Sequence, residues 1–305
     1  MLELSYDYDS CVKNSEKVAW RLDDVMPEGT RLDFTRPFLP EKLAPSARIA
    51  CLSGEERLVL NHITSNSYLN LFGFVEEYIL AMAVKHAHAE LFGDHDAIRA
   101  LTRFADEEVK HQALFKRYRA AFDRDFGHEC EVLDNAADIA GVILSKSPLA
   151  VVTVTLHLEL MTQDHYTSSV RDAQGLDPFF SKLLKHHWQE ESQHARIDAL
   201  ELDKMADASS EEVRARAFAD YLEIGGAFDG LLKAQAEMDV RSLARALGRT
   251  FNPDEVAQIA ASQHGGYRYT FLVAGMRHKT FVDTVRVVFG AESAAKVAQT
   301  AAALS

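Results

Sequence analysis

The chain has 305 residues, of which 47% are hydrophobic and 26% charged, a composition typical of a globular protein of one large or two small domains. Its net charge of −13 at pH 7 argues against nucleic acid or an anionic membrane as a partner. It contains no apolar run of eighteen or more residues, so no membrane span is expected, and its N-terminus lacks a basic segment followed by an apolar core, so no signal peptide is expected. The three scattered cysteines favour reduced thiols, so we expect a cytoplasmic protein without a membrane span.

Helix start and stop signals recur along the chain and predict an almost entirely helical protein. Four of the seven prolines fall within residues 27–48, which we expect to form an extended arm. Ser53 and Glu56 form a capping box, which predicts a helix from there to about residue 92. A second helix is expected to reach about residue 126, and a shorter one to cover about 130–145.

Two further helices are expected to begin at Ser147-Pro148 and Asp177-Pro178, where a capping residue precedes a proline in the first turn. The first of them is expected to close at Gly175. No segment shows sustained period-two alternation, so we expect little or no sheet. The later elements are expected to be a helix from Ser209 that breaks at Gly225-Gly226, a short helix from Asn252-Pro253, and a last long helix over 267–289.

The most informative pattern is a set of glutamates and histidines that occurs twice. Glu76, Glu108 and His111 return as Glu159, Glu191 and His194, all with an offset of 83 residues (159 − 76, 191 − 108 and 194 − 111). Residues three apart on a helix share one face, so each Glu-x-x-His pair can offer an oxygen and a nitrogen to one ion. A four-helix bundle builds a two-metal site from such a set, with a lone Glu on each of the other two helices.

We therefore predict an all-α fold, a ferritin-like four-helix bundle with additional N- and C-terminal helices. Residues 1–305 are expected to form a single domain, with a metal-binding bundle at about 54–206 and covering helices at about 210–305. One Glu-x-x-His alone is weak, because a solvated helix face produces it easily. Two copies at one offset are far more specific. Glu76 rather than its neighbour Glu77 fits that offset, although a stripe through Glu77 stays open.

His187 adds a further candidate ligand to the second copy. It lies four residues before Glu191 and seven before His194, on the same helical stripe. The alternative is a histidine at the surface or behind the ligands. The first copy has Phe104 and Ala105 around the equivalent place, so two bound metals would have different surroundings.

Four carboxylates with two or three imidazoles suit iron or manganese rather than structural zinc. Two ferric ions carry two more positive charges than four glutamates balance, so a bridging oxygen is expected, and on reduction the charges match. We expect two iron ions (Fe2+/Fe3+) with an oxo, hydroxo or peroxo bridge, a mixed Mn/Fe centre being the alternative. A third imidazole is expected to change the lifetime of an oxygen adduct.

Acidic residues also precede both paired ligands, at Glu107 and Glu190. An imidazole ligand usually donates its second N–H to a carboxylate or a carbonyl, which sets its tautomer. Glu107 is therefore a candidate partner for His194 and Glu190 for His111, with Asp106 as a competitor. The alternative is that both glutamates are simply exposed charges.

The pattern of the seven candidate ligands, with the extra imidazole only in the last helix, resembles the non-haem diiron N-oxygenases of the para-aminobenzoate N-oxygenase (AurF) type. Tyr68 and the segment 178–187 also look similar, and the resemblance covers about residues 55–200. It departs at Glu107 and Glu190, where that family often has Asp. The resemblance implies a homodimeric enzyme that uses two irons, O2 and an external electron donor to oxidise an arylamine.

Other functions remain open at this level. A diiron hydroxylase or desaturase acting on an apolar carbon substrate would use the same ligands, and a non-enzymatic ferritin-like iron-binding protein would share the bundle. A ribonucleotide reductase small subunit is disfavoured, because position 115 is Phe where a radical-bearing Tyr is wanted. Five aromatic residues near the ligands fit either an apolar pocket or the bundle core: Phe72, Phe74, Phe115, Tyr166 and Phe179.

Overall fold

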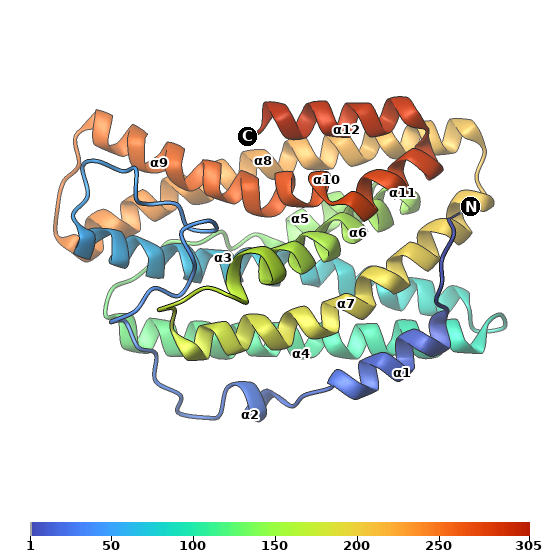
Figure 1. Cartoon of the computed structure of the whole chain (residues 1–305), viewed down its shortest axis with the longest axis horizontal. Helices are drawn as coiled ribbons and strands as arrows, with labels where there is room; N and C mark the ends of the chain where they lie inside the picture. Colours follow the sequence, from blue (N-terminus) through green and yellow to red (C-terminus); the bar gives the residue numbers. More distant parts are fainter. Residues whose placement is uncertain (1) are drawn as a thin grey trace.

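The fold was obtained as a computed structural model, which describes residues 2–305. These residues form helices and connecting segments with no strand, so the all-α prediction is confirmed. The helices that carry the candidate ligands pack mainly as two pairs, α3 (Gly54–Ala89) with α4 (His95–Phe126) and α6 (Pro148–His165) with α7 (Pro178–Asp207). In Figure 1, α4 lies along the lower part of the view, α7 runs obliquely above it, and α3 and α6 lie nearer the middle.

Three of the four bundle helices, α3, α6 and α7, begin where the sequence signals lie. The Ser53 hydroxyl accepts a hydrogen bond from the Glu56 backbone N–H, and the Glu56 side chain accepts one from the backbone N–H of Ser53. Asp177 caps α7 in the same way by accepting from the Phe180 N–H, with Pro178 in the first turn. At the end of α6 the chain widens into a π-helical turn, η1 (Tyr166–Val170), before α7.

Two short N-terminal helices lie along the outside of the bundle. α1 (Tyr8–Val18) packs against α4 and α7, and α2 (Leu22–Val25) follows it along the same side (Figure 1). The sequence patterns did not reveal either helix. Residues 27–48 form neither helix nor strand, in agreement with the expected extended arm.

The C-terminal part covers the opposite side of the bundle. α8 (Glu211–Leu247) packs on α3 and α6, and α9 (Pro253–Arg268) packs on α8. The remaining segments are η2 (Tyr269–Val273), α10 (Ala274–Arg277), α11 (Lys279–Phe289) and α12 (Ala291–Ala303). Within residues 2–305, no helix combines the length and the apolar character needed to cross a membrane.

Two predictions about this part are wrong. α8 runs unbroken through Gly225 and Gly226, because each internal glycine costs only about 1 kcal/mol and the packing of α8 on the bundle outweighs that cost. The long helix expected over 267–289 is divided instead. Its π-helical turn η2 and the extended backbone at His278 separate α9, α10 and α11.

Candidate metal centre

All seven residues proposed as ligands lie in the interior of the four-helix bundle. Each is no more than 3% exposed. Glu77, the alternative to Glu76, is only half-buried, so Glu76 is the glutamate of this pair that faces the centre. The contributions are Glu76 from α3, Glu108 and His111 from α4, Glu159 from α6, and His187, Glu191 and His194 from α7.

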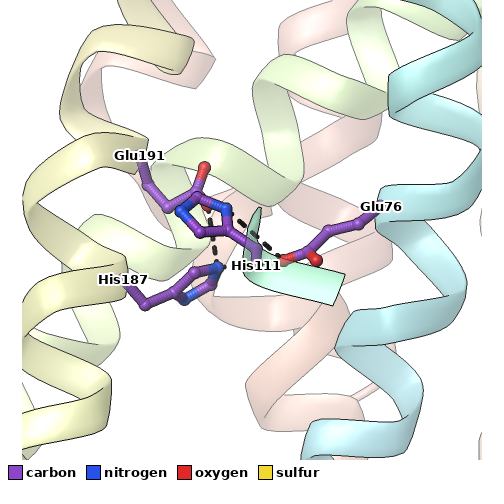
Figure 2. A group of neighbouring side chains, drawn as sticks. All are labelled: Glu76, His111, His187 and Glu191. Carbon is purple, nitrogen blue, oxygen red and sulfur yellow. Dashed lines mark hydrogen bonds and ion pairs between the residues drawn. The ribbon is translucent and has the colours of Figure 1, made fainter. Parts of the chain in front are cut away.

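Six of the seven side chains form two overlapping groups. One group is Glu76, His111, His187 and Glu191 (Figure 2), and the other is Glu108, His111, Glu191 and His194. Within each group, one candidate ligand atom per residue lies within 4.8 Å of all the others. Glu191 belongs to both groups and has two carboxylate oxygens, so the arrangement can hold two neighbouring metal ions, whereas His111 turns only Nδ1 to the centre and can bind one of them.

Imidazole nitrogens and carboxylate oxygens approach one another closely at the centre. His187 Nε2 lies 3.0 Å from Glu76 Oε1 and 2.8 Å from Glu191 Oε1. His111 Nδ1 lies 2.9 Å from Glu191 Oε1, and His194 Nδ1 lies 2.9 Å from Glu108 Oε1. Glu159 is outside both groups but lines the same cavity of about 10 Å³ as Glu76, His187 and Glu191.

The donor set fits a pair of cations. Glu76 Oε2, both Glu108 oxygens, Glu191 Oε1 and His111 Nδ1 are buried and make no well-aligned hydrogen bond among residues 2–305, although imidazole nitrogens lie within 2.9 Å of Glu191 Oε1 and Glu108 Oε1. Burying a carboxylate oxygen without a hydrogen bond is strongly destabilising. Several such oxygens in one place therefore require positive charge between them. Carboxylates with imidazoles are ligands that iron and manganese accept.

The pKa values of the cluster point the same way. Burial raises the pKa of Glu76, Glu108 and Glu159 above the ordinary value. Burial also acts to raise the pKa of Glu191, but His194 and His187 hold it well below that value. The pKa of His111 and of His194 is raised well above normal, against the effect of burial, chiefly by Glu191. Positive charge placed between these carboxylates would therefore stabilise the cluster.

Glu107 and Glu190 make the contacts that were expected of them. His111 Nε2 lies 2.9 Å from Glu190 Oε2, and His194 Nε2 lies 3.1 Å from Glu107 Oε2. Each carboxylate thus accepts the N–H of one imidazole and leaves that ring's Nδ1 turned to the centre. Asp106, the competing candidate, is exposed.

The N-terminal segment supplies residues that sequence spacing did not reveal. The Ser15 hydroxyl donates to Glu107, and the Trp20 ring stacks on His111 with ring centroids 5.9 Å apart. Lys110 donates to Glu190 at 2.5 Å and lies over the Trp20 ring. Ser15 is 92 residues from Glu107 in the chain, and Trp20 is 91 residues from His111 (111 − 20), so only the packing of α1 and α2 brings them here.

Asp198 is a further buried acid that was missed. It lies four residues after His194 and continues the same stripe of α7, so helical spacing was a usable signal. Both of its carboxyl oxygens lack a hydrogen-bond partner among residues 2–305, and burial raises its pKa well above the ordinary value.

The aromatic residues near the ligands serve different purposes. Phe72 and Phe115 pack edge-on against His187, with ring centroids 5.3 and 5.2 Å away. Phe74 lines a separate apolar cavity, Tyr166 stacks on Trp188, and Phe179 is only partly buried against the core. Tyr68, which strengthened the family resemblance, is buried with its hydroxyl 3.2 Å from His165 Nδ1.

No protein-family model matches this chain, and no curated protein matches it. Solved structures do. Two of them are an R2-like ligand-binding oxidase with an aerobically reconstituted Mn/Fe cofactor, one an amino-acid variant and the other after a long soak. Each is 15% identical with a TM-score of 0.50, and the match covers 88% of this chain and 95% or 94% of the other. The likeness confirms the ferritin-like helical fold.

Proposed function

We propose that this protein is an oxidase that activates O2 with two metal ions held by the seven buried residues of the centre. The observation that carries the proposal is the pair of overlapping ligand groups that share His111 and Glu191. The buried carboxylate oxygens without partners support it, because they need cations. The similar solved structures, whose described cofactor is Mn/Fe, add support from an independent direction.

The protein's own groups have three tasks in this proposal. Glu76, Glu108, His111, Glu159, His187, Glu191 and His194 bind the metals, and two iron ions or a Mn/Fe pair in this site would supply the reducing equivalents and open positions that O2 activation requires. Glu107 and Glu190 keep His194 and His111 in the tautomer that presents Nδ1 to the centre. The Phe72 and Phe115 rings beside His187 exclude water.

Within this class we propose N-oxygenation of an amine, most simply an arylamine. His187 supports this choice, because the third imidazole on one side of the centre is the feature shared with the para-aminobenzoate N-oxygenase type. Oxidation of a carbon substrate is the second candidate, favoured by the apolar residues around the centre. We also expect a homodimer and an external electron donor.

The deciding experiment loads the purified protein with ferrous iron under reducing, anaerobic conditions and mixes it with oxygen in a stopped-flow spectrometer. A transient absorption that decays faster with aniline or para-aminobenzoate, with a hydroxylamine or nitro product, supports N-oxygenation. Acceleration only by a C–H substrate supports the second candidate. No transient and no oxygen consumption at two irons per chain contradicts the oxidase proposal.

Two controls sharpen this test. His187→Ala is expected to keep part of the bound iron but to alter the lifetime of the transient, whereas Glu77→Gln, beside a ligand but turned away, should leave both unchanged. The number of subunits in the assembly and the amount of iron bound per chain distinguish an iron-storage protein from an oxidase. A 24-subunit particle that takes up far more than two irons per chain would identify an iron-storage protein instead.

A further inference from the structure

Three cavities follow one another between the surface and the metal centre. The outer cavity, of about 260 Å³, lies between α5 (Ala136–Leu144) and α8, and its walls include Val142 and Ala227. The inner cavity, of about 30 Å³, is walled by α3, α5, α6, α8, η2 and α10. The third is the cavity of the metal centre itself.

Neighbouring cavities in this row are lined by some of the same residues. The outer and inner cavities have four lining residues in common: Ile139, Ile143, Ile224 and Phe228. The inner cavity and the metal-centre cavity have Val75 and Leu158 in common. These two side chains come directly before Glu76 and Glu159 in the sequence, so a molecule in the inner cavity is one side chain away from two candidate ligands.

The inner cavity offers nothing to balance a charge. Its walls contain no Lys, Arg, Asp or Glu, and are formed largely by aromatic and aliphatic side chains such as Phe74 and Phe271. Its single imidazole is held in place, since His157 Nδ1 lies 2.9 Å from the Tyr221 hydroxyl and Nε2 lies 3.1 Å from the Phe271 carbonyl oxygen. Burial lowers the pKa of His157 to about 4, so this ring is neutral.

Apart from the glutamates of the metal centre, the charged groups along this row lie at the outer cavity. Lys146 borders the outer cavity and is paired with Glu223 at 2.5 Å, and Asp138 lies on the same rim. Over the cavity lies α5, a helix with only Ile143 fully buried and with Val142 56% exposed. Because α5 buries so few side chains, moving it away from the bundle costs little free energy. The inner cavity has room for about one water molecule, so it must widen to admit an organic molecule.

We propose that the substrate reaches the metal centre along this row of cavities, and that it is an uncharged, apolar organic molecule without a carboxylate or an alkylammonium group. The inference rests on the proposed oxidase function and narrows its substrate class. A carboxylate in the inner cavity would lose its hydration without gaining a partner. A neutral aromatic amine passes this test, because its nitrogen is not protonated at neutral pH, whereas para-aminobenzoate and alkylamines fail it.

The test measures binding to the full-length protein as purified, without reductant, so that turnover plays no part. The probe is N-phenyl-1-naphthylamine, a neutral aromatic amine that fluoresces when it leaves water. We expect Ala227→Trp, which fills the outer cavity from an exposed position of α8, to weaken probe binding about tenfold, equivalent to about 1.4 kcal/mol. Ala219→Trp, at an exposed position of the same helix that borders none of the three cavities, should bind the probe as the unaltered protein does.

Competition tests the substrate class. Para-butylaniline is expected to displace the probe, and para-aminobenzoate at the same concentration is expected not to. Equal binding by the two Trp variants would overturn the route, and displacement by para-aminobenzoate would overturn the charge rule. If circular dichroism shows that Ala227→Trp folds poorly, Ala227→Leu replaces it, with a smaller expected loss of probe affinity. A failure here leaves oxygen consumption intact, so it is distinct from failure of the oxidase proposal.

Discussion

Glu107 and Glu190 hold equivalent places in the two halves of the centre. Each precedes a candidate glutamate ligand by one residue, is buried, and faces the histidine of the opposite helix. Each is also fixed from outside, Glu190 by Lys110 and Glu107 by Ser15 and Arg103. The carboxylates therefore set the orientation of two imidazoles without belonging to either group of candidate ligands.

Replacing Glu190 by Gln is expected to weaken metal binding by about 10- to 100-fold, the usual effect of losing such a carboxylate. The amide keeps the size of the side chain but loses the charge that stabilises the His111 N–H. Titration of the apoprotein with Fe(II) or Mn(II) measures the change. Asp106→Asn, an exposed position on α4, is the matched control and should have no effect. Unchanged affinity in Glu190→Gln would show that the contact is not used.

Asp239 is a buried acid that is not one of the candidate metal ligands. It lies on α8, and its carboxyl group accepts hydrogen bonds from Ser67 on α3, Gln235 on α8 and Tyr267 on α9. Burial raises the pKa of Asp239 to about 7, although these hydrogen bonds act to lower it. The folded protein thus holds this proton where the unfolded chain has released it.

The contribution of Asp239 to the free energy of unfolding should therefore fall as pH rises from about 4 to about 7, since at this residue the folded state binds more protons than the unfolded state in that range. Each unit of pKa difference corresponds to about 1.4 kcal/mol. Asp239→Asn removes this contribution, so the variant should gain stability relative to the unaltered protein at pH 8 but not at pH 4. Urea unfolding at both pH values gives the comparison. Parallel pH profiles for the two proteins would refute the assignment.

Glycines act differently in the two C-terminal elements that departed from expectation. In α8, a Cβ at Gly226 would meet nothing within 4 Å. At Gly275 in α10, a Cβ would lie 2.7 Å from the His157 carbonyl oxygen and closer still to the imidazole ring. Gly226 therefore lowers the stability of a long helix without any packing reason, whereas Gly275 allows α10 to pack directly on α6.

Gly226→Ala is expected to stabilise the protein by about 0.5–1 kcal/mol, because alanine loses less backbone entropy and favours the helix. Gly275→Ala should destabilise it, because the neighbouring His157 is locked by two hydrogen bonds and cannot retreat. Urea unfolding midpoints of the two variants should move in opposite directions. A shift of the same sign in both would mean that propensity, not packing, decides at residue 275.

At the scale of the whole molecule, the buried cluster couples metal binding to the stability of the bundle. Four carboxylates from four helices repel one another unless cations or protons lie between them. Anything that binds the folded state alone stabilises it, so occupied metal sites should hold the four helices together.

Chelation of the metals is therefore expected to lower the melting temperature measured by scanning calorimetry, and adding Fe(II) or Mn(II) back should restore it. Glu108→Ala, which removes one of the mutually repelling groups and a candidate ligand, should show a smaller loss on chelation. A melting temperature that chelation does not change would mean that the site contributes nothing to the fold.

Local sequence rules were sufficient for the parts of this protein that depend on neighbours within one helix. Capping residues marked the starts of α3, α6 and α7, and three-residue spacing selected the histidines and glutamates that the structure brings together. Both signals are local, because helical geometry alone determines which residues share a face. The choice of Glu76 over Glu77 followed from the repeat, and burial of Glu76 agrees with it.

Tertiary packing alone decided the rest. It placed Ser15 and Trp20 from α1 and the segment after it against Glu107 and His111, carried α8 through two glycines, and divided the expected last helix around His278. It also lined up the cavities between α5 and the centre. Each of these depends on contacts between residues far apart in the chain, whose free energy exceeds the small local preferences that a sequence pattern reports.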